Sequence, residues 1–239
     1  MYAPFGAGAL VGPRATFSDG DPFLAGGGAV DLVDLDEVVW SDPPEREEAG
    51  SPNVLGAVAL HAAIDELTRI GWDAIVAHDR ELAEQLRGGL ERIPGVRVLG
   101  PAAHDVLPLA TFVVDGMHHA LMAARLSAEY GIGVRHGCFC AHPYLLRLLD
   151  LTADEIAEYH RAVGRGDRRE IPGAVRASAG LSTSAADIDR LLAAVAELAD
   201  GKPAPIAYAQ DLTGDYAPAE DAIGWPVDDG AEGTPCAPG

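Results

Sequence analysis

Lysine is nearly absent from this sequence, because 16 of its 17 basic residues are arginine and the remaining one is Lys202. Lys202 lies in "DGKPAPIAYAQ", where prolines and small residues are typical of a loop and not of a packed site. Chemistry that needs a buried lysine amine therefore has no candidate in a predicted core. Cysteine is also scarce, with three residues in 239, which excludes a disulfide framework and makes a reducing cytoplasm the expected compartment.

Three further features of the sequence exclude a membrane span, a secretion signal and two classes of partner. No run of about 18 uninterrupted apolar residues occurs, so no membrane-spanning helix is predicted. The opening "MYAPFGAGALVGPR" lacks the basic lead and apolar centre of a secretion signal. The formal net charge of −20 repels nucleic acid and anionic lipid over most of the surface. We therefore expect neither nucleic acid nor a membrane as a partner.

The apolar residues that are present, 48% of the chain, are patterned for a globular α/β fold. Helical spacing predicts helices over 54–71 and 72–92, and from Pro94 onward short strands alternate with helices. The strand candidates are "VRVLG", "PLATFVVDG", "IGVRHG" and "GAVRASA", and a last helix follows Ser184 with Asp187 three residues on. We predict the fold class α/β, with an α/β sandwich in the C-terminal part. The early segment "FGAGALVGPR" is predicted to be a short strand.

The C-terminal tail, residues 201–239, is acidic and rich in Pro, Gly and Ala. This composition favours disorder over its last third. Tyr208, Tyr216 and Trp225 are the aromatic side chains in the tail that are able to pin it to a surface.

One short stretch concentrates chemistry: "GVRHGCFCAHPYLL" places Cys138 and Cys140 two residues apart, flanked by His136 and His142. Structural zinc sites pair such a knuckle with a second ligand pair well downstream, and only Cys236 follows, so we expect no metal. A redox couple normally uses the C-x-x-C spacing at a helix start. Two buried thiols with a packing role are a further interpretation.

Arginines near this stretch favour a nucleophile. Arg135 directly precedes the motif and Arg176 lies in "PGAVRASAGLS". Cationic neighbours favour the thiolate form of a cysteine, which is the form that attacks. For each arginine, a surface salt bridge is the alternative interpretation.

Five segments in chain order resemble the C-terminal part of the class V aminotransferases. These are pyridoxal phosphate enzymes of fold type I that include cysteine desulfurases and selenocysteine lyases. "YAPFGAGALVG" resembles the strand after the cofactor-binding lysine, "PFLAGGGAV" the glycine-rich loop, and "EREEAGSPNVLGAVAL" the E-A-G-T-P-N motif. "GVRHGCFCAHP" is similar to the desulfurase loop V-R-x-G-x-x-C-A-x-P, and "PGAVRASAGLSTS" to the R-A-S-x-x-x-Y-N-T segment.

The resemblance implies roles for particular residues. Cys140 matches the desulfurase nucleophile, and Arg176 matches the arginine that binds the substrate α-carboxylate. Arg135 matches the loop arginine, implying a positioning and thiolate-stabilising role close to substrate. Ser51, with the adjacent Gly50, matches the threonine turn that reaches the cofactor phosphate, usually in the neighbouring subunit.

Two departures from the family pattern accompany the resemblance. "GLSTS" replaces G-x-Y-N-T, so the contacts of that Tyr and Asn are expected to be lost. In the family, a His-Lys pair immediately precedes the residues that match "MYAPFG", and the aspartate and the aromatic residue that contact the cofactor ring lie further upstream. The resemblance therefore implies the C-terminal portion of an enzyme whose Schiff-base lysine comes from the rest of a longer chain or from a separate chain.

This resemblance also implies an organisation and a function. Residues 1–71 are expected to be the C-terminal remainder of the large cofactor-binding domain with its long interdomain helix, and 72–200 the small α/β domain before the tail. The expected activity is cysteine desulfurase or selenocysteine lyase chemistry with pyridoxal phosphate, active once the lysine-bearing portion is supplied, in a homodimer or in association with that portion. Two alternatives stay open: an aminotransferase, lyase or epimerase in which Cys140 is not catalytic, and a non-catalytic half or scaffold without covalent cofactor.

Overall fold

The computed structural model describes residues 2–101 and 107–219. The chain divides into two compact units, with the boundary between Ala74 and Ile75. Each unit is described by itself. Within the described residues, no helix combines the length and the apolar character needed to cross a membrane.

The first unit contains one hairpin, two short helical segments and one long helix. Its elements are α1 (Arg14–Ser18), β1 (Val30–Val33), β2 (Val38–Trp40), the 3₁₀ helix η1 (Glu45–Glu47) and α2 (Val54–Ile70). The Asn53 side chain caps α2 by accepting a hydrogen bond from the Gly56 N–H at 2.9 Å. Gly71, with φ +94°, ends the helix. Both boundaries of this predicted helix are confirmed, because an amide cap and a glycine stop act locally.

The predicted strand in "FGAGALVGPR" is wrong. Residues 7–13 have no regular structure, and α1 forms directly after them. A strand needs a partner to satisfy its backbone groups. The described strands of the first unit are β1 and β2, which pair with each other antiparallel, so no strand is left for this segment.

The second unit is built on a four-stranded antiparallel sheet in the order β3-β4-β6-β5. All four strands were predicted from the sequence. Their bounds are β3 (Val96–Leu99), β4 (Leu109–Val114), β5 (Arg135–Gly137) and β6 (Ala174–Ser178). The helices of this unit are α3 (Trp72–Glu91, whose first turn precedes the boundary), α4 (His119–Tyr130), α5 (His142–Leu148), α6 (Ala153–Gly164) and α7 (Ala185–Ala199).

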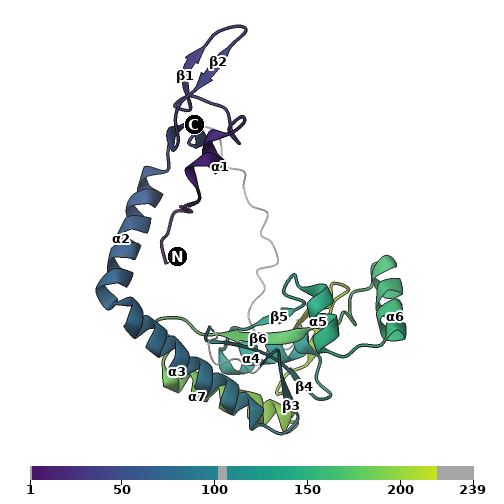
Figure 1. Ribbon diagram of the computed structural model, residues 1–239. Coiled ribbons are helices and arrows are strands. Elements are labelled where there is room, and N and C mark those ends of the chain that lie inside the picture. Colours follow the sequence, from purple (N-terminus) through teal and green to yellow (C-terminus); the bar gives the residue numbers. More distant parts are fainter. Residues whose placement is uncertain (1, 102–106, 220–239) are drawn as a thin grey trace, which may run out of the picture. The chain divides into compact units, whose positions relative to one another are not determined.

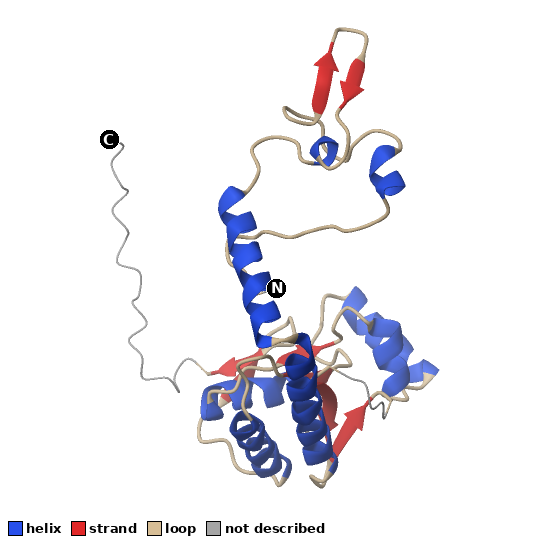
Figure 2. Cartoon of the chain, turned by 60° about the vertical axis from the view of Figure 1, so that its left-hand side comes forward, coloured by secondary structure: helices blue, strands red, loops and turns tan. Residues whose placement is uncertain are grey.

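Three helices cover one face of this sheet, as Figure 1 and Figure 2 show for α3, α4 and α7. Every second residue of β4 points into this layer, with Phe112 fully buried at its centre. The shared core consists of Leu82, Leu86, Leu90, Ala110, Phe112, Val114, Met122, Leu126, Val175, Ala177, Ile188, Leu191, Ala194, Val195 and Leu198. The opposite face carries α5, which packs Leu145 against Leu99 and Ala174. The α/β fold class is therefore confirmed.

A second hairpin, β7 (Tyr208–Gln210) with β8 (Tyr216–Pro218), follows α7. The Tyr208 hydroxyl donates a hydrogen bond to Glu129 at 3.1 Å, and Glu129 forms a buried ion pair with Arg125 at 2.6 Å. Two of the tail's aromatic residues thus lie in an ordered hairpin that packs against α4. Trp225 and the last third of the tail lie outside the described residues.

Candidate functional site

The two arginines singled out from the sequence lie directly opposite each other in the sheet. Arg176 on β6 pairs with Arg135 on β5 and, on its other side, with Thr111 on β4. Directly paired residues share a face, so all three side chains belong to the face that also carries α5. The register of three strands therefore assembles two positive charges in one row.

Arg176 carries an unsatisfied polar atom. Its Nε is buried and has no hydrogen-bond partner among the described residues. An unmade bond to a buried donor costs about 1–3 kcal/mol, and like charges directly opposite in a sheet add repulsion. An anion on this face relieves both costs, and a guanidinium binds a carboxylate with two parallel hydrogen bonds. The geometry therefore suits a carboxylate ligand.

Cys140 lies in a tight turn at the end of β5. The Ala141 N–H donates a hydrogen bond to the Cys138 carbonyl at 2.9 Å, which closes a four-residue turn. Both central residues have positive φ, Phe139 at +54° and Cys140 at +58°. This conformation costs non-glycine residues about 1–3 kcal/mol each and is held only where the surroundings enforce it.

Arg176 on β6 contacts this turn. Its guanidinium carbon lies 5.1 Å from the centre of the Phe139 ring. This cation–π contact fastens the turn to β6 and brings the arginine next to the cysteine loop. Cys140 is exposed, whereas Cys138 is half-buried and packs against the cluster of Leu99, Leu145 and Ala174.

A pocket of about 300 Å³ opens beside Cys138. Its walls come from α3, the ends of β3 and β4, the cysteine turn and α5, and they include Arg87, Thr111, Phe139 and Tyr144. Most of the remaining wall is aliphatic. Cys138 therefore faces a sheltered, largely apolar space, in contrast to exposed Cys140.

The other two predicted site residues, Ser51 and Gly50, belong to the first unit. The Gly50 N–H donates to the Gly27 carbonyl at 2.8 Å, and the Asn53 side-chain amide donates to the Phe5 carbonyl at 2.7 Å. These bonds join the first three of the five segments quoted above. Gly50 has φ +87°, which suits glycine, and Ser51 is exposed with no side-chain hydrogen bond within the described residues.

Lys202 is engaged away from the arginines and the cysteines. Its Nζ lies 2.5 Å from Glu197 Oε2 at the end of α7 and 5.1 Å from the centre of the Tyr130 ring. The lysine side chain is 47% exposed. The prediction that this lysine has a loop position outside any packed site is confirmed.

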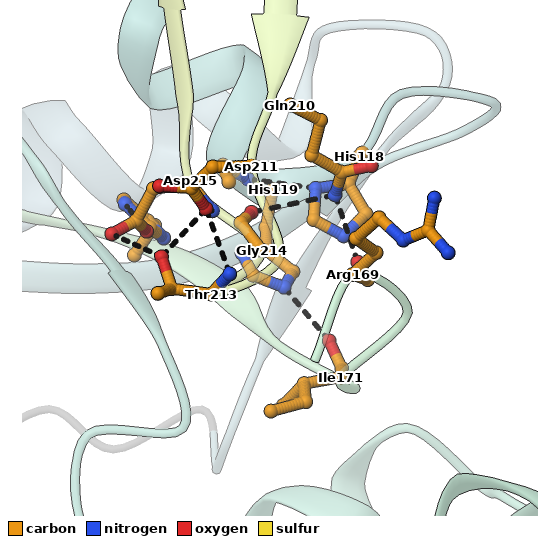
Figure 3. A network of polar contacts seen from close by, with 11 residues as sticks. His118, His119, Arg169, Ile171, Gln210, Asp211, Thr213, Gly214 and Asp215 are labelled. Carbon is orange, nitrogen blue, oxygen red and sulfur yellow. Dashed lines mark hydrogen bonds and ion pairs between the residues drawn. The ribbon is translucent and has the colours of Figure 1, made fainter. Parts of the chain in front are cut away.

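The sequence reasoning missed a histidine cluster under the C-terminal hairpin. The rings of His118 and His119 lie 4.2 Å apart, and those of His119 and His136 lie 5.5 Å apart. Figure 3 shows the surrounding polar network: the His119 Nε2 lies 3.0 Å from the Ile171 carbonyl, while Asp211 and Thr213 organise the hairpin turn. The signals in the sequence are the His118-His119 dipeptide and His136, which lie far apart along the chain. Among the described residues, no group of three or more His, Cys, Asp or Glu is arranged to hold a metal ion.

Burial controls the ionisation of this cluster. Desolvation lowers the pKa of His119 to about 4, only partly offset by its bond to the Ile171 carbonyl. Desolvation also lowers the pKa of His118. His136 Nε2 lies 3.5 Å from an Asp215 carboxylate oxygen, linking β5 to the loop between β7 and β8.

The chain belongs to the aminotransferase class-V family, whose family model matches residues 1–191. It is 34% identical over 197 residues to a probable cysteine desulfurase of Halobacterium salinarum, covering 82% of this chain and 42% of the relative. It is 36% identical over 202 residues to a probable cysteine desulfurase of Vibrio cholerae, covering 84% of this chain and 44% of the relative. The chain therefore spans less than half the length of these curated relatives.

Solved structures give the same assignment for the fold. The cysteine desulfurase CsdA of Escherichia coli superposes with a TM-score of 0.64 at 30% identity, over 83% of this chain and 43% of that one. The cysteine desulfurase of Thermococcus onnurineus superposes with a TM-score of 0.62 at 31% identity, over 75% and 40%. The β7–β8 hairpin lies beyond the residues that the family model matches.

Proposed function

We propose that this chain forms the sulfur-accepting and substrate-binding part of a cysteine desulfurase, with Cys140 as the acceptor. The observation that carries the proposal is the position of Cys140, exposed in a strained turn whose neighbouring Phe139 stacks on Arg176. A nucleophile must be accessible and held next to the group that binds its substrate. The desulfurase names of the relatives support the same substrate class.

Arg176 and Arg135 bind the substrate in this proposal. Arg176 donates its unsatisfied Nε–H and a terminal N–H to the α-carboxylate of the amino acid. Arg135, directly opposite on β5, adds positive charge and holds the strand that leads into the cysteine turn. Anchoring the carboxylate on β6 fixes where the substrate sulfur lies relative to Cys140.

The family implies the cofactor pyridoxal phosphate. The residues before helix α2 fit one part of this cofactor, its phosphate group. The exposed hydroxyl of Ser51 is free to donate a hydrogen bond to a phosphate oxygen, which we assign to the site of a neighbouring subunit, whereas the Gly50 N–H is already bonded to the Gly27 carbonyl and Gly50 shapes the turn beside it. When bound, the cofactor supplies the electron sink that weakens bonds at the substrate α- and β-carbons. Lys202 is engaged elsewhere, so the amine that holds the cofactor comes from outside residues 1–239.

Sulfur transfer itself uses groups of this chain. The Cys140 thiolate attacks the sulfur of the bound cysteine, the carbon–sulfur bond breaks, and the sulfur atom remains on Cys140 as a persulfide. The carbon skeleton takes up a proton and leaves as alanine. Exposure of Cys140 then allows the terminal sulfur to reach a second molecule.

The test follows alanine formation from cysteine by the natural protein that contains this sequence, loaded with pyridoxal phosphate. Cys140→Ser is expected to reduce turnover by at least about 100-fold, because a hydroxyl cannot replace the attacking thiolate. Cys236→Ser is the matched control and is expected to keep full activity. Unchanged alanine formation in Cys140→Ser refutes Cys140 as the sulfur acceptor. Conversion of cysteine without alanine, to a keto-acid, elimination or racemised product in the same samples, favours the aminotransferase, lyase or epimerase alternative. No amino-acid conversion by the parent protein supports the non-catalytic alternative.

A further inference from the structure

Cys138 has no role in the proposed reaction, yet the fold holds it in the same turn as Cys140. We infer that Cys138 is a resolving cysteine: it attacks the Cys140 persulfide and releases the transferred sulfur as free sulfide. Because Cys140 must first carry a sulfur atom, this role of Cys138 rests on the proposed function.

The closed turn brings the backbone of Cys138 close to that of Cys140. Cys138 is the first residue of the turn that the 2.9 Å bond to Ala141 closes, and Cys140 is the third. Because Cys138 and Cys140 are only two residues apart, their Cα atoms lie within about 7 Å of each other, and disulfides form between Cα atoms about 4.4–6.8 Å apart. The separation of the two Cα atoms is therefore of the size that a disulfide spans.

The two thiols differ in exposure, as an accepting cysteine and a resolving cysteine must. Cys140 is exposed and receives sulfur from a substrate. Cys138 is half-buried, lines the apolar pocket, and contacts the cluster around Leu145. Incoming sulfur therefore meets Cys140 first, and Cys138 attacks only from within the protein.

The turn is fixed at its apex. Phe139, between the two cysteines, stacks on Arg176, and both Phe139 and Cys140 are kept at positive φ. Backbone strain of this kind is a feature of functional loops. It also limits the motions available to the cysteines, which raises the effective concentration of one thiol at the other.

The chemical step balances without an external oxidant. The Cys138 thiolate attacks the Sγ of Cys140, a Cys138–Cys140 sulfur–sulfur bond forms, and the bond from Cys140 Sγ to the terminal sulfur breaks. The terminal sulfur leaves as hydrosulfide with the electron pair of the broken bond. Two equivalents of a small-molecule thiol then reduce the disulfide and return both cysteines to thiols.

The experiment loads the persulfide chemically, so it needs neither cofactor nor lysine. The full chain in a Cys236→Ser background is treated with inorganic polysulfide, excess reagent is removed, and the intact mass and released sulfide are followed. We expect this protein to release one sulfide per chain and to end two hydrogen masses below its reduced form. Cys138→Ser in the same background is expected to keep one extra sulfur on Cys140 at least about 10-fold longer.

Two outcomes overturn the inference. The first is an equal persulfide lifetime with and without Cys138. The second is equal uptake of sulfur by Cys140→Ser and by the parent, because it makes Cys138 the accepting residue. Since loading bypasses the amino-acid substrate, either result is independent of whether the natural protein converts cysteine to alanine.

Discussion

At the scale of single residues, the proposed substrate binding depends most on Arg176. Replacing it with lysine keeps one positive charge but removes the planar pair of donors and the stacking partner of Phe139. Losing a charge-assisted hydrogen bond costs about 1.5–3 kcal/mol, so the KM for cysteine is expected to rise about 10- to 100-fold in the loaded natural protein. Steady-state kinetics measure this change.

A matched substitution separates substrate binding from general effects on folding. Arg190→Lys changes an exposed arginine on α7 whose contact to Asp187 is 3.7 Å long, and the KM is expected to stay the same. Equal KM values for Arg176→Lys and Arg190→Lys contradict the assignment of Arg176 to the carboxylate.

His119 gives the protein a predictable response to acid. Its native pKa of about 4 lies below the ordinary value of 6.5, so below pH 6.5 the unfolded chain binds the proton first. The contribution of His119 to stability is therefore complete above pH 6.5, falls as the pH drops from 6.5 to 4, and is level below that. The loss is at most about 3 kcal/mol. Urea unfolding at a series of pH values measures it.

The histidine control uses the pH slope and not the absolute stability. His119→Gln is expected to flatten the slope between pH 6.5 and 4, whatever its effect at neutral pH. His160→Gln, at an exposed position on α6, is expected to leave the slope unchanged. A slope that persists in His119→Gln means that other groups cause the acid sensitivity.

How far the site was predictable differs from residue to residue. Cys140, Arg135 and Arg176 stand in motifs whose order along the chain is readable, and Arg135 and Arg176 were placed in strand candidates that formed. Their direct opposition was not predictable, because it depends on the register between two strands separated by α5 and α6. The stack of Phe139 on Arg176 and the histidine cluster likewise arise from tertiary packing between distant segments.

At the scale of elements, helix α7 begins with a complete capping box. The Ser184 hydroxyl accepts a hydrogen bond from the Asp187 N–H at 3.3 Å, and the Asp187 carboxylate accepts one from the Ser184 N–H at 2.9 Å. Ser184→Ala is expected to lower the free energy of unfolding by about 1 kcal/mol. Ser182→Ala, at an exposed position two residues earlier, is expected to have no measurable effect. Equal urea midpoints for the two variants contradict the cap.

Helix boundaries are predictable from the sequence because the residues that set them act locally. Ser184 and Asp187 act over three residues, as do Asn53 at the start of α2 and Gly131 at the end of α4, so the helix boundaries were predictable. The segment 7–13 was mispredicted because strand formation depends on a distant partner. The β7–β8 hairpin was missed for the same reason, since its anchors on α4 lie far away in sequence.

At the scale of the whole molecule, the first unit exposes many large apolar side chains. Val11, Phe23 and Leu35 are 92%, 91% and 98% exposed. Apolar surface of this extent marks a region that another polypeptide covers. We therefore expect the 239-residue chain to associate in a concentration-dependent way at micromolar levels, which sedimentation velocity measures.

Substitutions in each unit test where this association arises. The combined change of Val11, Phe23 and Leu35 to serine is expected to shift the protein toward monomer. Leu212→Ser removes an exposed leucine of the second unit, 65% exposed, and is expected to leave the association unchanged. A monodisperse monomer of the parent chain at all concentrations rules out the expected partner surface.

The most direct test of the central claim follows the sulfur atom itself. The loaded natural protein with Cys138→Ser, which blocks resolution, is given cysteine labelled in its sulfur, and the tryptic peptide spanning residues 136–147 is analysed by mass spectrometry. The account predicts one labelled sulfur on Cys140 and none after the further change Cys140→Ser. Formation of alanine with no label on Cys140 contradicts it.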